Sequence, residues 1–489
     1  MKTNTLDFDA QALREKILDL AMRGKLVPQD SNDEPASVLL EKIKAEKEQL
    51  IKEKKIKKGK PLAPITDDEK PFDIPDSWEW VRLGDICISN IGVTYKPSYK
   101  VEEPTKTKIL RANNIENNQL NNKKLVFLTL DTLPDKYYLK ENDILMAVRS
   151  GSKRLVGKSA VVTHDFANYS FGAFMSKIRV IQANSYFVDY FLNSLFFREQ
   201  LRDTNTTTIN QITQSMINNF VIPFPPLSEQ SRIAAKIAQL FALLRKVESS
   251  TQQYAKLQTL LKSKVLDLAM RGKLVEQDPH DEPASVLLEK IKAEKEQLVK
   301  EGKIKKSKPL PPITDDEKPF DIPDSWEWVR LGDVLDVRDG THDTPKYVSE
   351  GIALVTAKNL KDGKIDFSNI KYISEKDAQK INQRSNVETD DILFAMIGTI
   401  GNPVLITKRN NFAIKNVALL KHAKYVNMDF VCKYILASES FLLEYANGGN
   451  QKFISLNKIK KLGFPLPPLV EQQNIVSKIN NIFTLLTSI

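Results

Sequence analysis

Apolar residues recur at alternating spacings of four and three along residues 228–271, a stretch that contains neither Pro nor Gly. The pattern runs through Ile233, Ile237, Leu240, Leu244, Val247, Thr251, Tyr254, Gln258, Leu261, Val265 and Leu268. A period of 3.5 residues predicts a helix of about 60 Å with a coiled-coil seam, softened at Thr251, Tyr254 and Gln258. A long helix lying on a globular core is the alternative.

The same phase returns near both ends of the chain. It is carried by Leu13, Ile17 and Leu20 at the N-terminal end and by Ile475, Ile479, Ile482 and Leu486 at the C-terminal end. We therefore expect these end segments to pair in antiparallel fashion with the central helix.

Two internal repeats frame the rest of the chain. Residues 18–86 and 266–334 align without a gap at an offset of 248 and are identical at 61 of 69 positions. A shorter repeat relates residues 223–244 to 465–486 at an offset of 242. The two ends are thus halves of a unit that the middle contains whole, which predicts pseudo-twofold symmetry with a circular organisation.

Between the repeats lie two inserts that differ from each other. We expect five segments: an N-terminal helical region (1–77), a first insert (78–222), a central helical region (223–325), a second insert (326–464) and a C-terminal helix (465–489). Short strands with Gly or Asn turns, and one late helix each near 184–203 and 428–446, predict mixed α/β inserts. The predicted class is α+β, with two mixed α/β domains separated by long antiparallel coiled-coil helices.

Bulk composition narrows the function. The 489 residues carry 72 basic and 62 acidic side chains, a net charge of +10 that suits a polyanionic partner without proving one. Cys87 and Cys432 stand apart, as expected of reduced thiols. Without an 18-residue apolar run or a signal pattern, we expect a soluble, cytoplasmic protein and no membrane partner.

Loops at corresponding points of the inserts are rich in side chains that read DNA. Arg, Asn, Gln and Lys bond base edges, while Ser, Thr and Lys mostly hold phosphates. The first insert offers Arg111, Asn113, Asn114, Arg149, Ser150, Lys153, Arg154, Thr208, Asn210 and Gln211. The second offers Arg338, Thr341, His342, Lys346, Lys358, Asn359, Asn450, Gln451 and Lys452. Any one of them is typical of a surface turn, so the hypothesis depends on their matched placement.

No catalytic constellation accompanies these loops. The sequence has no GxGxxG or GxxxxGK[ST] motif, and its four histidines lie far apart. The acidic runs at residues 67–69 and 315–317 fit a linker better than a metal site. We expect no catalytic residues and no metal site in this chain.

The repeated motifs LDLAMRGKLV, EPASVLLEKIKAEKEQL, KPFDIPDSWEWVRLGD and PxPPLxEQ resemble those of the specificity subunits of Type I restriction–modification systems, over essentially the whole length. The resemblance implies two target-recognition domains, each reading one half of a split asymmetric DNA site, and helices that set the gap between the halves. It also implies that two modification subunits bind the helices and methylate adenine, and that restriction subunits join them. S-adenosylmethionine, ATP and Mg would belong to those partners, with no cofactor in this chain.

Two rival functions stay open. A protein-interaction scaffold would use the duplicated helices without reading DNA, and a self-contained methyltransferase or nuclease would need a cofactor or metal motif.

One departure from the repeat pattern bears on the length of the gap between the two half-sites. The C-terminal helix reaches Ile489, which matches Val247, whereas the internal copy continues for about twenty residues.

Overall fold

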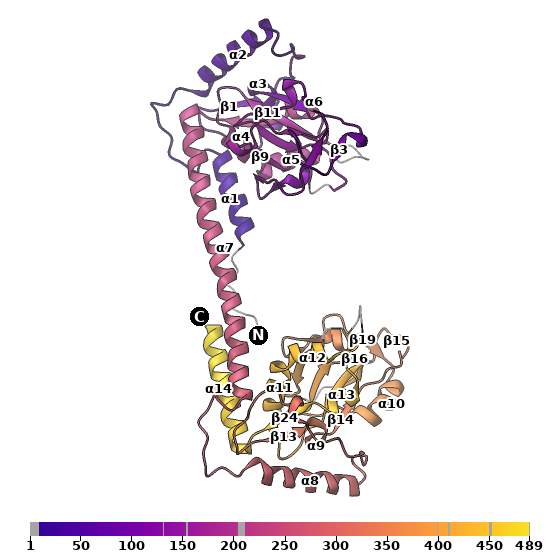
Figure 1. The fold of residues 1–489 in the computed structure, drawn as a ribbon. Coiled ribbons are helices and arrows are strands. Elements are labelled where there is room, and N and C mark those ends of the chain that lie inside the picture. The colour runs from indigo at the N-terminus through magenta and orange to yellow at the C-terminus, as the bar shows by residue number, and fades with distance from the viewer. Residues whose placement is uncertain are drawn as a thin grey trace. The chain divides into compact units, whose positions relative to one another are not determined.

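A computed structural model describes residues 9–130, 132–152, 155–203, 211–398, 400–408, 411–448 and 452–488. The chain divides into two compact units, residues 8–250 (the first unit) and residues 251–489 (the second unit). The long helix α7 (Leu227–Met270) contributes its beginning to the first unit and its end to the second (Figure 1). The predicted helix over residues 228–271 is confirmed.

The first unit has helices both before and within its insert. Its helices are α1 (Ala10–Met22), α2 (Ala36–Lys52), α3 (Leu83–Ile86), α4 (Ser185–Leu192), α5 (Leu195–Asp203) and α6 (Gln214–Asn219). Its strands are β1 (Glu79–Arg82), β2 (Cys87–Ile91), β3 (Lys100–Val101), β4 (Thr107–Leu110), β5 (Ile115–Glu116), β6 (Gln119–Leu120), β7 (Val126–Leu128), β8 (Ile144–Ala147), β9 (Ser159–Val161), β10 (Ser170–Phe171), β11 (Met175–Val180) and β12 (Val221–Phe224).

The second unit repeats this plan. Its helices are α8 (Ala284–Lys300), α9 (Leu331–Val334), α10 (Glu375–Ser385), α11 (Met428–Ala437), α12 (Glu439–Tyr445), α13 (Leu456–Lys460) and α14 (Leu469–Ser488). Its strands are β13 (Glu327–Arg330), β14 (Val337–Asp339), β15 (Tyr347–Val348), β16 (Ile352–Thr356), β17 (Leu360–Lys361), β18 (Lys364–Ile365), β19 (Lys371–Ile373), β20 (Ile392–Ala395), β21 (Gly401–Leu405), β22 (Phe412–Lys415), β23 (Val417–Leu420) and β24 (Gly463–Leu466).

Sheet order is the same in the two units. One four-stranded sheet runs β2-β11-β8-β9 in the first unit and β14-β23-β20-β21 in the second. The other runs β10-β4-β7-β3 and β22-β16-β19-β15, with a parallel pair at β10–β4 and at β22–β16. A short antiparallel pair, β1–β12 or β13–β24, closes each insert. Two inserts with different sequences therefore share one mixed α/β fold, and the predicted class is confirmed.

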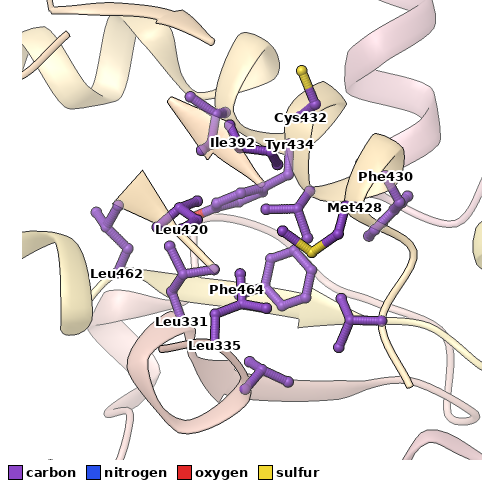
Figure 2. Packing of buried hydrophobic residues seen from close by; sticks show 14 of the residues in the cluster. Leu331, Leu335, Ile392, Leu420, Met428, Phe430, Cys432, Tyr434, Leu462 and Phe464 are labelled. Atoms are coloured by element: carbon purple, nitrogen blue, oxygen red, sulfur yellow. The ribbon is translucent and has the colours of Figure 1, made fainter. Parts of the chain in front are cut away.

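The core of the second unit shows how helix and sheet pack. Aromatic and aliphatic side chains from α9, α11 and strands β20, β23 and β24 meet in one buried cluster (Figure 2). Tyr434 lies inside this cluster and donates its hydroxyl hydrogen to Gly463 O at 2.5 Å. A buried phenol needs such a partner, because an unpaired hydroxyl would lose its hydrogen bonds to water.

A buried glutamate joins the helices to the insert in each unit. In the first, Glu229 on α7 accepts hydrogen bonds from Trp78 Nε1 at 2.9 Å and Gln29 Nε2 at 2.6 Å. In the second, Glu471 on α14 accepts from Trp326 Nε1 at 2.8 Å and from the matching Gln277. Burial raises the pKa of both carboxyl groups. The repeated Glu of PxPPLxEQ is therefore a structural link.

The expected antiparallel helix pairs form within each unit. In the first, the Arg14 guanidinium on α1 binds the Glu248 carboxylate on α7 with two hydrogen bonds of 3.0 and 2.5 Å. In the second, Gln258 in the second half of α7 donates to Leu486 O near the end of α14. Figure 1 shows α1 and α14 beside successive parts of α7.

Burial along these helices departs from a continuous seam. Among the predicted positions, Ile233, Ile237, Leu244, Ile475 and Ile479 are buried, and Leu240, Val265, Leu268, Ile482 and Leu486 are partly buried. Val247 and Leu261 are 44% and 49% exposed. Residues outside the heptads are buried instead, including Phe241, Leu266, Ala269 and Met270, because α7 also packs against the inserts.

One local expectation is wrong. The single late helix of each insert is two helices, α4 and α5 or α11 and α12, with a break at Asn193–Ser194 in the first unit and at Ser438 in the second. Pro223 and Pro465 lie within strands β12 and β24, opposite Trp80 and Trp328. A proline is tolerated there because each strand pairs on one side only.

Candidate nucleic-acid interface

The first candidate loop follows strand β4 in the first unit and strand β16 in the second. The backbone N–H of Arg111 donates to Asn114 Oδ1 at 2.9 Å, and Asn114 Nδ2 donates to the carbonyls of Asn121 and Lys123. Asn114 is fully buried, so it holds the loop together and does not face a ligand. Asn113 beside it is exposed.

The second unit builds this loop in the same way. The backbone N–H of Thr356 donates to Asn359 Oδ1 at 3.0 Å, and Asn359 Nδ2 donates to Asp366 O at 3.0 Å. Asn359 is 8% exposed, whereas Lys358 is exposed. The prediction that Asn114 and Asn359 contact bases does not agree with the burial of these two side chains. Asn113 and Lys358 are the side chains that this turn presents to solvent. The signal was an Asn at the third position of a short turn in both inserts, where a side chain often caps backbone N–H groups.

Arg111 has a mixed environment. The side chain is partly buried, and Nη2 donates to Lys124 O at 3.1 Å. Its Nε is buried with no hydrogen-bond partner among the described residues. A buried guanidinium nitrogen without a partner is costly, so Arg111 is a residue whose environment a ligand or water would complete.

The second candidate loop follows strand β8. Arg149 is exposed, with its guanidinium carbon 5.1 Å from the centre of the Phe174 ring. Gln211 forms an isolated antiparallel bridge with Arg149, which brings the two predicted segments together. Ser150 is partly buried and accepts from Ser152 N. Four further candidates lie outside the described residues: Lys153, Arg154, Thr208 and Asn210.

In the second unit, the segment after β14 carries a polar cluster. The two ring nitrogens of His342 lie 2.9 Å from Asp339 Oδ2 and 3.0 Å from Asn416 Oδ1. Asp339 is 4% exposed and also binds Arg384. The cluster fixes the exposed imidazole at the end of the sheet, and Thr341 beside it forms a bridge with Lys415.

The remaining candidates of the second unit differ in whether another group of the protein already binds their side chains. Arg338 is ion-paired with Asp336 at 2.7 Å, and Lys452 donates to Leu443 O at 2.9 Å. Lys346 is exposed, as Lys358 is. Asn450 and Gln451 lie outside the described residues. The fold therefore uses Arg338 and Lys452, while Lys346 and Lys358 extend towards solvent.

The first acidic run and the two cysteines have structural roles where the chain is described. Glu69 of the first acidic run binds Arg82 at 2.6 Å, which lowers the pKa of that carboxyl to about 2. Burial raises the pKa of Cys87 to about 12 and of Cys432 to about 11, as in unreactive thiols. Over the described ranges, no group of three or more His, Cys, Asp or Glu could hold a metal, and no helix is long and apolar enough to cross a membrane.

The comparison with known families decides the family. The Type I restriction modification DNA specificity domain matches residues 75–258 and 323–489. This chain belongs to that family. The predicted resemblance to Type I specificity subunits is confirmed, and such subunits are the non-catalytic DNA-recognition components of their systems.

Relatives cover the chain almost completely. The specificity subunit of the Type I restriction enzyme EcoAI from Escherichia coli is 32% identical over 97% of this chain and 89% of its own length. The EcoEI specificity subunit from the same species is 31% identical over the same shares. A chain solved in work on complex assembly and conformational transition of the type I R-M system has a TM-score of 0.57 at 20% identity, over 86% of this chain and 93% of that one. This last likeness concerns the fold.

Within this specificity-subunit fold, two exposed side chains and one partly buried side chain at the ends of the sheets were not among the predicted residues. Phe174 is 56% exposed beside Arg149, and Phe453 is 41% exposed beside Lys452. Asn416 faces His342. No motif identifies them, because the two inserts carry different residues at these places and only the backbone register matches them.

Proposed function

We propose that each unit reads one half of a split, asymmetric DNA site, and that the helices set the distance between the halves. One observation carries this proposal. The two units have the same sheet order, but their loops carry different side chains. Loops on a fixed scaffold are the usual place where one fold acquires separate specificities.

The exposed loop chemistry favours DNA. Arg149, Gln211 and Asn113 in the first unit, and Lys346 and Lys358 in the second, are exposed side chains of the kinds that bond bases or phosphates. A scaffold that binds only proteins is the second candidate. A salt titration separates the two, because each phosphate contact steepens the fall of affinity with salt.

We further propose that the helix pairs bind two adenine-N6 methyltransferase subunits, one for each unit, and through them the ATP-dependent restriction subunits. Leu13 on α1 and Leu261 on α7 occupy equivalent positions at the offset of 248 and are 42% and 49% exposed. Equivalent exposed leucines just before the near-identical repeats suit two copies of one partner. S-adenosylmethionine, ATP and Mg would be bound by these partners.

The test is to co-express this chain with its modification subunit and to map N6-methyladenine in genomic DNA by long-read sequencing. We expect one split motif, methylated on both strands, that disappears when the gene for this chain is deleted. A stable complex that leaves the DNA unmethylated would favour the scaffold instead.

A further inference from the structure

Three positions meet at the end of strand β8 in the first unit. The backbone N–H of Ile212 donates to Val148 O at 2.7 Å, and one residue further Arg149 bridges Gln211. Phe174 completes the group, since its carbonyl accepts from both Val148 N at 2.9 Å and Arg149 N at 3.2 Å. Backbone hydrogen bonds thus hold Arg149, Phe174 and Gln211 side by side.

The second unit holds the equivalent three positions on the equivalent backbone. Ile454 N donates to Met396 O at 2.9 Å, and one residue further Ile397 bridges Phe453. Asn416 directly precedes β23, as Phe174 precedes β11, and both strands pair in the same register with the neighbouring strand. The backbone matches Arg149 with Ile397, Phe174 with Asn416, and Gln211 with Phe453.

The side chains at these matched positions differ in kind. The first unit carries an exposed guanidinium above an exposed ring, next to an exposed amide. The second carries a half-buried aliphatic side chain beside a phenyl ring and an amide that His342 holds. Such a change of chemistry on an unchanged backbone is expected where two domains recognise different things.

Among the described residues, the Arg149 side chain has no hydrogen-bond or ion-pair partner, and its contact is the face of the Phe174 ring. Arg179 in the same sheet differs, because it forms two 2.7 Å bonds with the buried Asp143 carboxylate. A guanidinium supported on a ring keeps its fork of donors free for a planar acceptor pair.

From this geometry we propose that these three positions determine base specificity, and that Arg149 reads a guanine in the half-site of the first unit. Guanine presents O6 and N7 in the major groove, the acceptor pair that an Arg fork matches. At the equivalent position Ile397 contacts a thymine methyl group, which an aliphatic side chain suits. The inference rests on the proposed reading of one half-site by each unit.

The test maps methylated motifs for the complex with wild-type chain, Arg149→Ala, Arg149→Lys and Ile397→Ala. We expect Arg149→Ala to relax one G·C position in one half-site, with discrimination there falling roughly 5- to 150-fold. Ile397→Ala relaxes a position in the other half-site. Lys140→Ala is the control, because it removes an exposed cation beyond the opposite end of β8 and should leave the motif intact.

Each other result has a distinct meaning. A wild-type complex that methylates no split motif would contradict the proposed function itself. A wild-type motif that Arg149→Ala keeps in full, or weakens uniformly while Arg149→Lys restores it, would make Arg149 a phosphate contact and overturn the inference. Relaxation at an A·T position would overturn the assignment of guanine.

Discussion

Trp78 donates its indole hydrogen to the carboxylate of Glu229, a residue 151 positions away, at 2.9 Å. Both side chains are almost fully buried, at 3% and 1% exposed. Trp326 and Glu471 repeat the bond at 2.8 Å in the second unit. Each insert is thereby attached to its helices through its first tryptophan.

Replacing Glu229 by Ala tests this attachment. We expect the first unit to lose about 1–3 kcal/mol of unfolding free energy, because the buried donors of Trp78 and Gln29 lose their acceptor. Hydrogen exchange should rise in residues 8–250 and stay unchanged in residues 251–489. Glu471→Ala should show the reverse, and the exposed Glu48→Ala should change neither unit. A uniform rise in both units would contradict the account.

The buried Asp189 side chain should make the unfolding free energy of the first unit depend on pH. Its burial raises the pKa to about 7, and Oδ1 has no hydrogen-bond partner among the described residues. Between about pH 4 and pH 7 the folded unit keeps a proton that the unfolded chain has released. Unfolding free energy should therefore fall as pH rises, by up to about 1.4 kcal/mol per pH unit, and level off above pH 7.

Urea denaturation of wild type and Asp189→Asn across this range provides the measurement. The variant should lack this fall and be the more stable protein at pH 8. The exposed Asp165→Asn is the control and should keep the wild-type profile. Parallel profiles for wild type and Asp189→Asn would show that the buried carboxyl does not titrate as described.

The two leucines Leu244 and Leu261 should respond differently to Asp. Leu244 is 9% exposed, so Leu244→Asp buries a charge and should cost several kcal/mol of stability. Leu261→Asp should fold normally and lose one of the two modification subunits. Leu13→Asp should do the same for the other unit. Native mass spectrometry counts the bound subunits, and two bound to the Leu13/Leu261 double variant would exclude these leucines from the interface.

Substitutions of two neighbouring asparagines in the loop after β4 should have different effects, one on stability and the other on DNA binding. Asn114→Ala should lower the unfolding free energy by about 1–3 kcal/mol, because two backbone carbonyls and one N–H lose a buried partner. Asn113→Ala should leave stability unchanged and weaken DNA binding. Thermal unfolding and a binding titration at fixed salt distinguish the two. Equal stability of the two variants would contradict the structural role of Asn114.

Much of the fold could be predicted from the sequence because repetition marks it. The repeat of PxPPLxEQ at a constant offset of 242 marked Glu229 and Glu471 as equivalent. The heptad period located α7, but it could not show that Leu261 would stay exposed. α14 lies beside this part of α7, since Gln258 bonds Leu486, yet Leu261 lies on a face of the helix that stays exposed.

The candidate interface was harder to predict from the sequence than the fold. Residue type favoured Asn114 and Asn359 as base contacts, yet the same hydrogen-bonding capacity let them support their own loops. Phe174 and Asn416 share no residue type, and only the strand register shows that they are equivalent. Side chains that differ between two copies of a fold cannot be matched by sequence alone when loop lengths also differ.

The most direct measurement of the central claim is an exchange of the second insert, residues 326–464, for that of another family member, followed by mapping of the methylated motif. Since each unit is expected to read its own half, the exchange should change the half-site of the second unit and leave the other half-site as in wild type. Altered bases in both half-sites would contradict independent reading by the two units.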